Sequence, residues 1–191
     1  LSQNPIDLSA LGKIVICWLA TPIGGFLFTF VFYYLFKKLF EWFNVDMVAS
    51  DGILRTGLIL AGCYGAYALG ANNVANVTGV YVGGGLLNET QAVLIGGVSI
   101  AIGVITYSKN VMLTVGKSIV PLDAFSALVT VVAHAVTVHI FAIIGVPVST
   151  SQAIVGAVMG IGIIRNIEAI NYKVVTKIFS GLVFFGNSKP S

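Results

Sequence analysis

Three asparagines inside an apolar stretch are the first side chains in this sequence that could bind an ion. Asn72, Asn73 and Asn76 belong to the segment GANNVAN, residues 70–76. An amide buried in hydrocarbon is costly unless it finds partners, so these amides need a cavity, an ion or one another. Asn72 and Asn76 share one helical face, so their carbonyls and any unwound backbone could converge on a small cation. Neutral oxygens favour Na⁺ over a transition metal, and hydrogen bonding between helices is the plainer alternative.

A second polar group follows Pro147. Ser149, Thr150, Ser151 and Gln152 precede a long apolar run, so their hydroxyls and free backbone N–H groups stand at a predicted helix N-terminus. Such a terminus favours anions, because its N–H groups point outward and the helix dipole is positive there. The plainer interpretation is that Ser149 and Gln152 form a capping box.

The remaining reactive side chains do not indicate an enzyme. His134 and His139 are five residues apart, so they point to different faces, and no carboxylate stands near them in sequence. This favours hydrogen-bonding or pore-lining roles over zinc binding or proton transport. Cys17 and Cys63 lie in apolar segments without CxxC spacing and are interpreted as small buried hydrophobes. The sequence contains neither a catalytic pair of carboxylates nor a Ser/His/Asp series.

These residues stand in a strongly apolar chain. Of its 191 residues, 57% are hydrophobic and 9% are charged, which excludes an ordinary soluble domain. The net charge is +3, but the Lys and Arg residues are scattered between apolar runs, so nucleic acid binding is not expected. We therefore expect a multi-pass protein of the cell membrane.

Apolar runs define the elements that would position the polar groups. The sequence predicts an all-α transmembrane bundle, a single domain over residues 1–191, with spans at about 12–36, 52–79, 91–108, 125–145 and 147–164 and a partial span at 173–185. Residues 41–55 are expected to form a loop or surface helix, and residues 110–123 to be interfacial. We also expect the helix to be interrupted at 70–79 and at the glycines 83–85.

The stretch from 125 to 164 has an apolar arm, a polar tip and a second apolar arm. This pattern predicts a re-entrant hairpin, although charge alone does not separate it from two full crossings. In the second arm, Gly156 and Gly160 form a GxxxG pair, which favours close helix packing.

Basic residues predict the orientation. If the runs cross alternately, one side holds Lys37, Lys38, Arg55, Lys109, Lys117, Arg165, Lys173 and Lys177. The positive-inside rule makes that side cytoplasmic.

Both polar motifs resemble those of the inorganic phosphate transporter (PiT) family. The family pattern is close to GANDVAN in one segment and PVST[TS][HQ] in another, and here the segments read GANNVAN at 70–76 and PVSTSQ at 147–152. The likeness covers most of the chain, including residues 106–116, and the motif order resembles the family's C-terminal half. Family members carry two inverted repeats, each with both motifs, so the resemblance implies one repeat that needs a complementary N-terminal half. The first residue, Leu1, also suggests a cut inside a longer polypeptide.

The resemblance further implies cation-coupled transport of inorganic phosphate across the lipid bilayer, with Na⁺ or H⁺ as coupling ion and no other cofactor. It assigns phosphate binding to Ser149, Thr150, Ser151, Gln152 and Asn76, and cation binding to Asn72, Asn73, Asn76 and Gln152. Asn73 departs from the family, which usually has Asp there, so the coupling ion and its stoichiometry stay open. The alternatives are a permease for sulfate or another oxyanion, and a truncated remnant that transports nothing. The oligomeric state beyond the two halves also stays open.

Overall fold

The computed structural model describes residues 8–44, 47–118, 122–146 and 148–165, and over these ranges the regular structure is entirely helical. The helices are α1 (Leu8–Trp42), α2 (Met47–Gly83), α3 (Glu89–Ser118), α4 (Ala124–Ile144) and α5 (Thr150–Ile164). Four stretches are long and apolar enough to cross a membrane: Val15–Trp42, Ser50–Gly83, Glu89–Lys109 and Ala124–Ile144. Helices suit such segments because each backbone group finds its partner within the helix.

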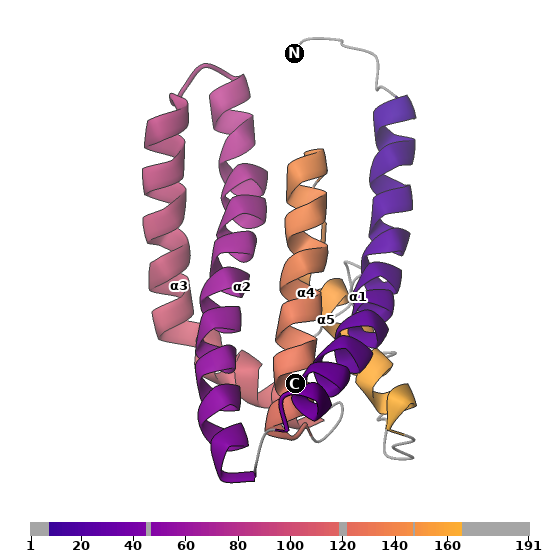
Figure 1. Ribbon diagram of the computed structural model, residues 1–191. Helices are drawn as coiled ribbons and strands as arrows, with labels where there is room; N and C mark the ends of the chain where they lie inside the picture. The colour runs from indigo at the N-terminus through magenta and orange to yellow at the C-terminus, as the bar shows by residue number, and fades with distance from the viewer. Residues whose placement is uncertain (1–7, 45–46, 119–121, 147, 166–191) are drawn as a thin grey trace, which may run out of the picture.

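Three long helices and one shorter helical hairpin make up the bundle. In Figure 1, α1, α2 and α3 run the length of the molecule, and α4 stands between α1 and α2. Helix α3 packs against α2, while α5 packs against α1 and α4. Helix α1 is bent in Figure 1, as a proline inside a helix favours, and it contains Pro22.

The α4–α5 hairpin has the proportions of a re-entrant element. Helix α5 has 15 residues and is therefore about 22 Å long, shorter than a hydrocarbon core of roughly 30 Å. Helix α4 ends below the upper ends of α2 and α3 in Figure 1, and α5 returns toward the lower end. Gly145 ends α4 with φ of 76°, a left-handed conformation that glycine adopts without strain.

Close contact between α1 and α5 fixes the second arm of this hairpin. A Cβ atom at Gly156 would overlap the carbonyl oxygen of Pro22, and one at Gly160 would come within 2.9 Å of Thr29 Cβ. The buried Thr29 hydroxyl donates to the carbonyl of Ala157 at 3.1 Å. The packing role expected for the GxxxG pair is thus confirmed.

Two sequence-based expectations about the elements are wrong. Helix α2 continues through residues 70–79 without interruption, and the side chains of Asn72 and Asn73 find hydrogen-bond partners while the backbone stays helical. Residues 41–55 include the end of α1 and the start of α2 rather than a loop or a surface helix. Helix α3 extends to Ser118, while its membrane-length stretch ends at Lys109, so the interfacial position of residues 110–123 stays a prediction. The predicted breaks at 83–85 and at the hairpin tip are present. The partial span at 173–185 lies outside the described residues.

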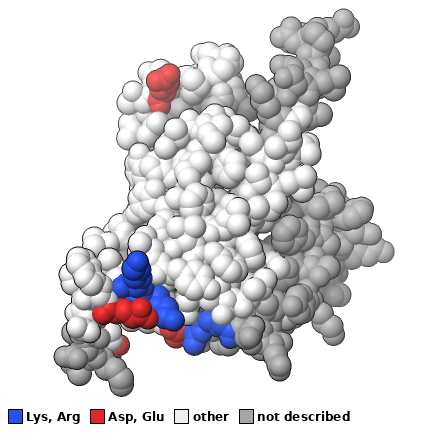
Figure 2. Space-filling view, turned by 45° about the vertical axis from the view of Figure 1, so that its right-hand side comes forward, with Lys and Arg blue, Asp and Glu red and all other residues white. Residues whose placement is uncertain are grey.

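Charged side chains gather at one end of the molecule. The end of α1, the start of α2, the end of α3 and both feet of the hairpin lie at the lower end in Figure 1, and these segments carry Lys37, Lys38, Arg55, Lys109 and Arg165. Figure 2 shows Lys and Arg together with acidic residues along this lower edge. The α2–α3 turn at the opposite end is followed by Glu89.

Candidate functional site

The two polar motifs meet through Asn72. This side chain is 3% exposed, and its Nδ2 donates to the carbonyl oxygen of Val148 at 3.1 Å. The N–H of Val148 donates back to Asn72 Oδ1 at 3.5 Å, and Asn72 Nδ2 also donates to Asn73 Oδ1 at 3.0 Å. The amide therefore satisfies the backbone of the hairpin tip and fastens that tip to α2.

At the hairpin tip, Ser149 caps α5 with its side chain. Its backbone is extended, and its Oγ accepts a hydrogen bond from the N–H of Gln152 at 3.4 Å. Gln152 Oε1 is buried without a hydrogen-bond partner, so the reciprocal half of a capping box is not made. The capping alternative therefore describes Ser149, while Thr150 and Ser151 line a cavity.

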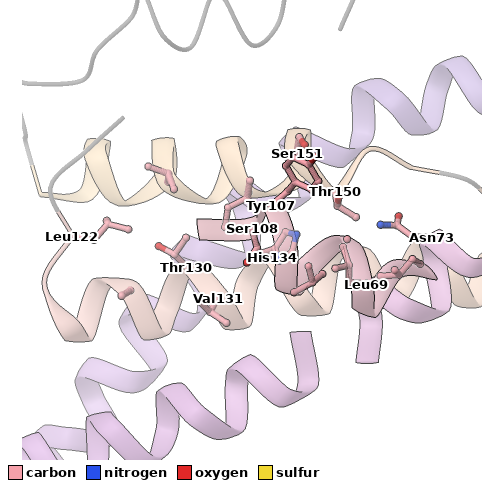
Figure 3. A pocket seen from close by; sticks show the side chains of 16 residues that line it. Leu69, Asn73, Tyr107, Ser108, Leu122, Thr130, Val131, His134, Thr150 and Ser151 are labelled. Carbon is pink, nitrogen blue, oxygen red and sulfur yellow. The ribbon is translucent and has the colours of Figure 1, made fainter. Parts of the chain in front are cut away.

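This cavity, the tip cavity, has a volume of about 680 Å³ and lies among α2, α3, α4 and α5. That volume is in the range of small-ligand sites. Its polar lining consists of Asn73, Tyr107, Ser108, Thr130, His134, Thr150 and Ser151. Figure 3 shows Thr150 and Ser151 at one end of α5, His134 of α4 close to them, and Asn73 of α2 to one side. Apolar residues and a glycine make up the rest of the lining, so the hydroxyls, the amide and the imidazole occupy part of it, beside a helix N-terminus that suits an oxyanion.

Asn76 lines a second cavity and not the tip cavity. The second cavity has a volume of about 390 Å³ and is lined by Asn72 and Asn76, together with Gly145 and Val146 at the end of α4. Asn72 and Asn76 share a helical face, as their spacing predicts, while Asn73 lines the tip cavity. The structure therefore places the asparagines on two sides of the hairpin tip.

The cavity also contains residues that sequence analysis did not single out. These are Ser108 of α3 and Thr130 of α4, which stands one helical turn before His134, a residue that the sequence did single out. The four-residue spacing of Thr130 and His134 places them on one face, but nothing in the sequence identified that face as the one toward α5. His139 lies elsewhere, where its Nδ1 is 2.6 Å from the Tyr64 hydroxyl.

An ion pair joins the two feet of the hairpin. Arg165, directly after α5, contacts Asp123, directly before α4, and also donates to Ser126 Oγ at 3.2 Å. The Ser126 hydroxyl donates to Asp123 Oδ1 at 2.7 Å. Burial alone would raise the pKa of Asp123, but the hydrogen bond from Ser126 and the charge of Arg165 together hold this pKa below its ordinary value.

Comparison with known proteins places this geometry among transporters. The sequence pattern of the phosphate transporter family matches residues 41–184. A candidate phosphate permease of Methanocaldococcus jannaschii is 26% identical, with 93% of this chain and 57% of that protein covered. The sulfate permease CysP of Bacillus subtilis is 32% identical over 86% of this chain and 46% of that protein. The sodium-dependent phosphate transporter 1 of Homo sapiens is 32% identical over 74% of this chain and 22% of that protein.

A solved structure is also similar. It is described as the sodium-dependent phosphate transporter, and it matches with a TM-score of 0.58 and 26% identity over 95% of this chain and 54% of that chain. The chain thus spans about half the length of the first two relatives and of this structure, and less of the human protein.

Proposed function

Because this chain belongs to the phosphate transporter family, we propose that it forms one half of a secondary transporter that moves inorganic phosphate across the cell membrane together with a cation. The observation that carries this proposal is the tip cavity, where Thr150 and Ser151 stand at the N-terminus of α5 beside helices of membrane length. Such a chain has no chemical step to catalyse, and its work is to bind and release its substrate. The proposal therefore concerns a transporter rather than an enzyme.

Phosphate binding would use the hydroxyls and the helix terminus together. Thr150 and Ser151 donate hydrogen bonds to phosphate oxygens, and the positive end of the α5 dipole stabilises the negative charge. Ser149 keeps the first turn of α5 in place through its bond to Gln152 N–H. Asn76 would contribute to phosphate binding from the second cavity, and the side chain of Gln152 from the first turn of α5.

Cation binding would use the amide oxygens. Gln152 Oε1 is buried without a partner, and a free acceptor of this kind suits a cation or a protonated group. Asn73 and Asn76 add neutral oxygens on two sides of the hairpin tip, while Asn72, also expected from the sequence to bind the cation, pairs with the backbone of Val148 and holds the tip in place. Since Asn73 carries no charge, this site attracts Na⁺ less strongly than a carboxylate would.

The proposed partner is a complementary N-terminal half. Ser151 and Asn76 are exposed in this chain, although Asn76 lies on the membrane-length helix α2 and Ser151 lies at the tip of the hairpin between apolar helices. Polar groups at such a depth are expected to face protein or a water-filled cavity rather than lipid. A second repeat packed over them would close the substrate path, and the length of the relatives leaves room for one.

Radiolabelled phosphate uptake tests this function. The chain is co-produced with a complementary half from a family relative and placed in vesicles, with Na⁺ and pH gradients applied separately. We expect gradient-driven uptake that falls at least tenfold in Ser151→Ala and is retained in the control Ser99→Ala, an exposed serine of α3 outside the tip cavity. Properly inserted protein that transports nothing under any gradient would overturn the proposal.

Sulfate is the second candidate substrate, since a relative 32% identical to this chain is a sulfate permease. Hydroxyls and a helix N-terminus bind tetrahedral oxyanions without an obvious preference between them. A competition experiment distinguishes the two substrates. If a tenfold excess of sulfate abolishes phosphate uptake, and labelled sulfate is itself taken up, sulfate is the main substrate.

A further inference from the structure

The described lining of the tip cavity contains one imidazole, a side chain that can take up and release a proton. Among the described residues that line it there is no Asp, Glu, Lys or Arg, and its titratable groups are Tyr107 and His134. A tyrosine hydroxyl normally loses its proton only near pH 10, whereas histidine titrates across the physiological range. Among the described residues of the lining, His134 is therefore the only one that could bring a positive charge to an anion in this cavity.

The position of His134 matches this role. The imidazole hydrogen bonds with the backbone of Thr150, the first residue of α5. It lies close to Thr150 and Ser151 in Figure 3. A protonated His134 would therefore lie next to an oxyanion bound at the N-terminus of α5.

No other described residue of the tip cavity carries a charge that could pair with a bound anion. The other polar residues of the described lining are Asn73 from α2, Tyr107 and Ser108 from α3, Thr130 from α4, and Thr150 and Ser151 from α5, and none of them is an acid or a base of the Asp, Glu, Lys or Arg type. The charges of Asp123 and Arg165 are engaged with each other at the feet of the hairpin. Asn73, the polar residue that α2 contributes to the cavity, is uncharged.

We propose that His134 carries the coupling proton of this transporter, an inference that rests on the proposed function. From the outer solution the neutral imidazole takes up one H⁺, and the resulting imidazolium pairs with the oxyanion at Thr150 and Ser151. On the inner side the anion leaves and the ring releases the same H⁺, so that one proton crosses with each anion on this residue and the imidazole returns to its neutral form. The structure thus gives His134 a role that its isolated place in the sequence did not indicate.

The test measures separately whether a proton gradient or a Na⁺ gradient drives transport and whether the protein transports phosphate at all. Vesicles containing the chain and its complementary half receive either a pH gradient at equal Na⁺ or a Na⁺ gradient at equal pH. Phosphate accumulation, phosphate–phosphate exchange and proton entry, followed with a trapped pH dye, are measured for the wild type and for His134→Gln. Glutamine retains a hydrogen-bonding side chain but cannot be protonated at these pH values.

We expect the wild type to accumulate phosphate with the pH gradient and to bring in protons with it. In His134→Gln, accumulation should fall at least tenfold relative to exchange, and the pH dependence of uptake between pH 5 and pH 8 should flatten. His139→Gln, on the same helix but outside the tip cavity, serves as the matched control and should keep the wild-type pH profile.

Two other results overturn the inference and differ from a failure of the proposed function. Uptake driven by Na⁺ alone, or a His134→Gln variant with wild-type proton entry, would leave phosphate transport in place and remove the role of His134. Inserted wild-type protein that neither accumulates nor exchanges phosphate would overturn the proposed function, and this inference with it.

Discussion

At the scale of single residues, Asn72 explains how two motifs far apart in the sequence become one site. Its amide pairs with both backbone groups of Val148, and neither partner is exposed to solvent. The same side chain orients Asn73 by donating to its Oδ1. Asn72 is therefore a positioning residue, since its hydrogen bonds are already used within the protein.

Replacing Asn72 tests that assignment. Asn72→Ala leaves the N–H and the carbonyl of Val148 buried without their partner, so we expect a loss of about 1–3 kcal/mol in the free energy of unfolding. Denaturant titration in detergent, followed by tryptophan fluorescence, measures this loss. The control is Asn76→Ala, an exposed position on the same face of α2. Equal effects of the two substitutions would contradict a special role for Asn72.

At the scale of elements, the α4–α5 hairpin is held at three places by different interactions. Asn72 holds its tip, small residues hold α5 against α1, and the Asp123–Arg165 pair joins its feet. These contacts keep Thr150 and Ser151 beside the tip cavity. A substitution that weakens any of these contacts should therefore displace Thr150 and Ser151, although the substituted residue does not itself line the tip cavity.

A methyl group at Gly156 tests the α1–α5 contact. The added Cβ of Gly156→Ala would overlap the Pro22 carbonyl, so one of the two helices must move. Overpacking of this kind typically costs about 1–3 kcal/mol, and thermal unfolding of the purified protein should show the loss. Gly62→Ala is the matched control, because nothing lies within 4 Å of its added Cβ. A variant as stable as this control would show that the contact is looser than described.

Acid should weaken the feet of the hairpin. The folded pKa of Asp123 is below its unfolded value, so its contribution to stability is complete above the unfolded pKa and is lost as pH falls through the folded pKa. We expect Asp123→Asn to be less stable than the wild type at about pH 7, with the difference shrinking toward about pH 3. Denaturant titrations at both pH values measure it, with Asp51→Asn as an exposed control. A difference that does not change with pH would contradict this linkage.

At the scale of the whole molecule, the sequence predicted the helices better than their contacts. Apolar runs of membrane length located the four spanning stretches, and Pro147 with the hydroxyl residues 149–151 that follow it located the hairpin tip. The break expected near Asn73 was wrong, because a polar side chain in an apolar run does not reveal whether it binds an ion or a neighbouring loop. The surroundings of His134 could not be predicted for a related reason: its neighbours in the cavity come from α3 and α5, and local spacing does not reveal which helices pack together.

Orientation in the membrane gives the last prediction, which concerns all helices at once. The basic ends of the helices should face the cytoplasm and the α2–α3 turn should face outward. With Cys17 and Cys63 replaced by Ser, a membrane-impermeant maleimide added to intact cells should label Glu89→Cys and should label Lys38→Cys only after lysis.

The same labelling separates a re-entrant hairpin from a full crossing. A single cysteine at Ile143, an exposed residue near the upper end of α4, should resist the impermeant reagent from outside if the tip ends within the bilayer. It should still react with a membrane-permeant reagent, which verifies that the thiol is accessible. Rapid labelling of Ile143→Cys in intact cells, at the rate found for Glu89→Cys, would instead place the tip at the outer surface. Helix α5 would then have to cover roughly 30 Å with 15 residues, for which about 22 Å of helix is too short.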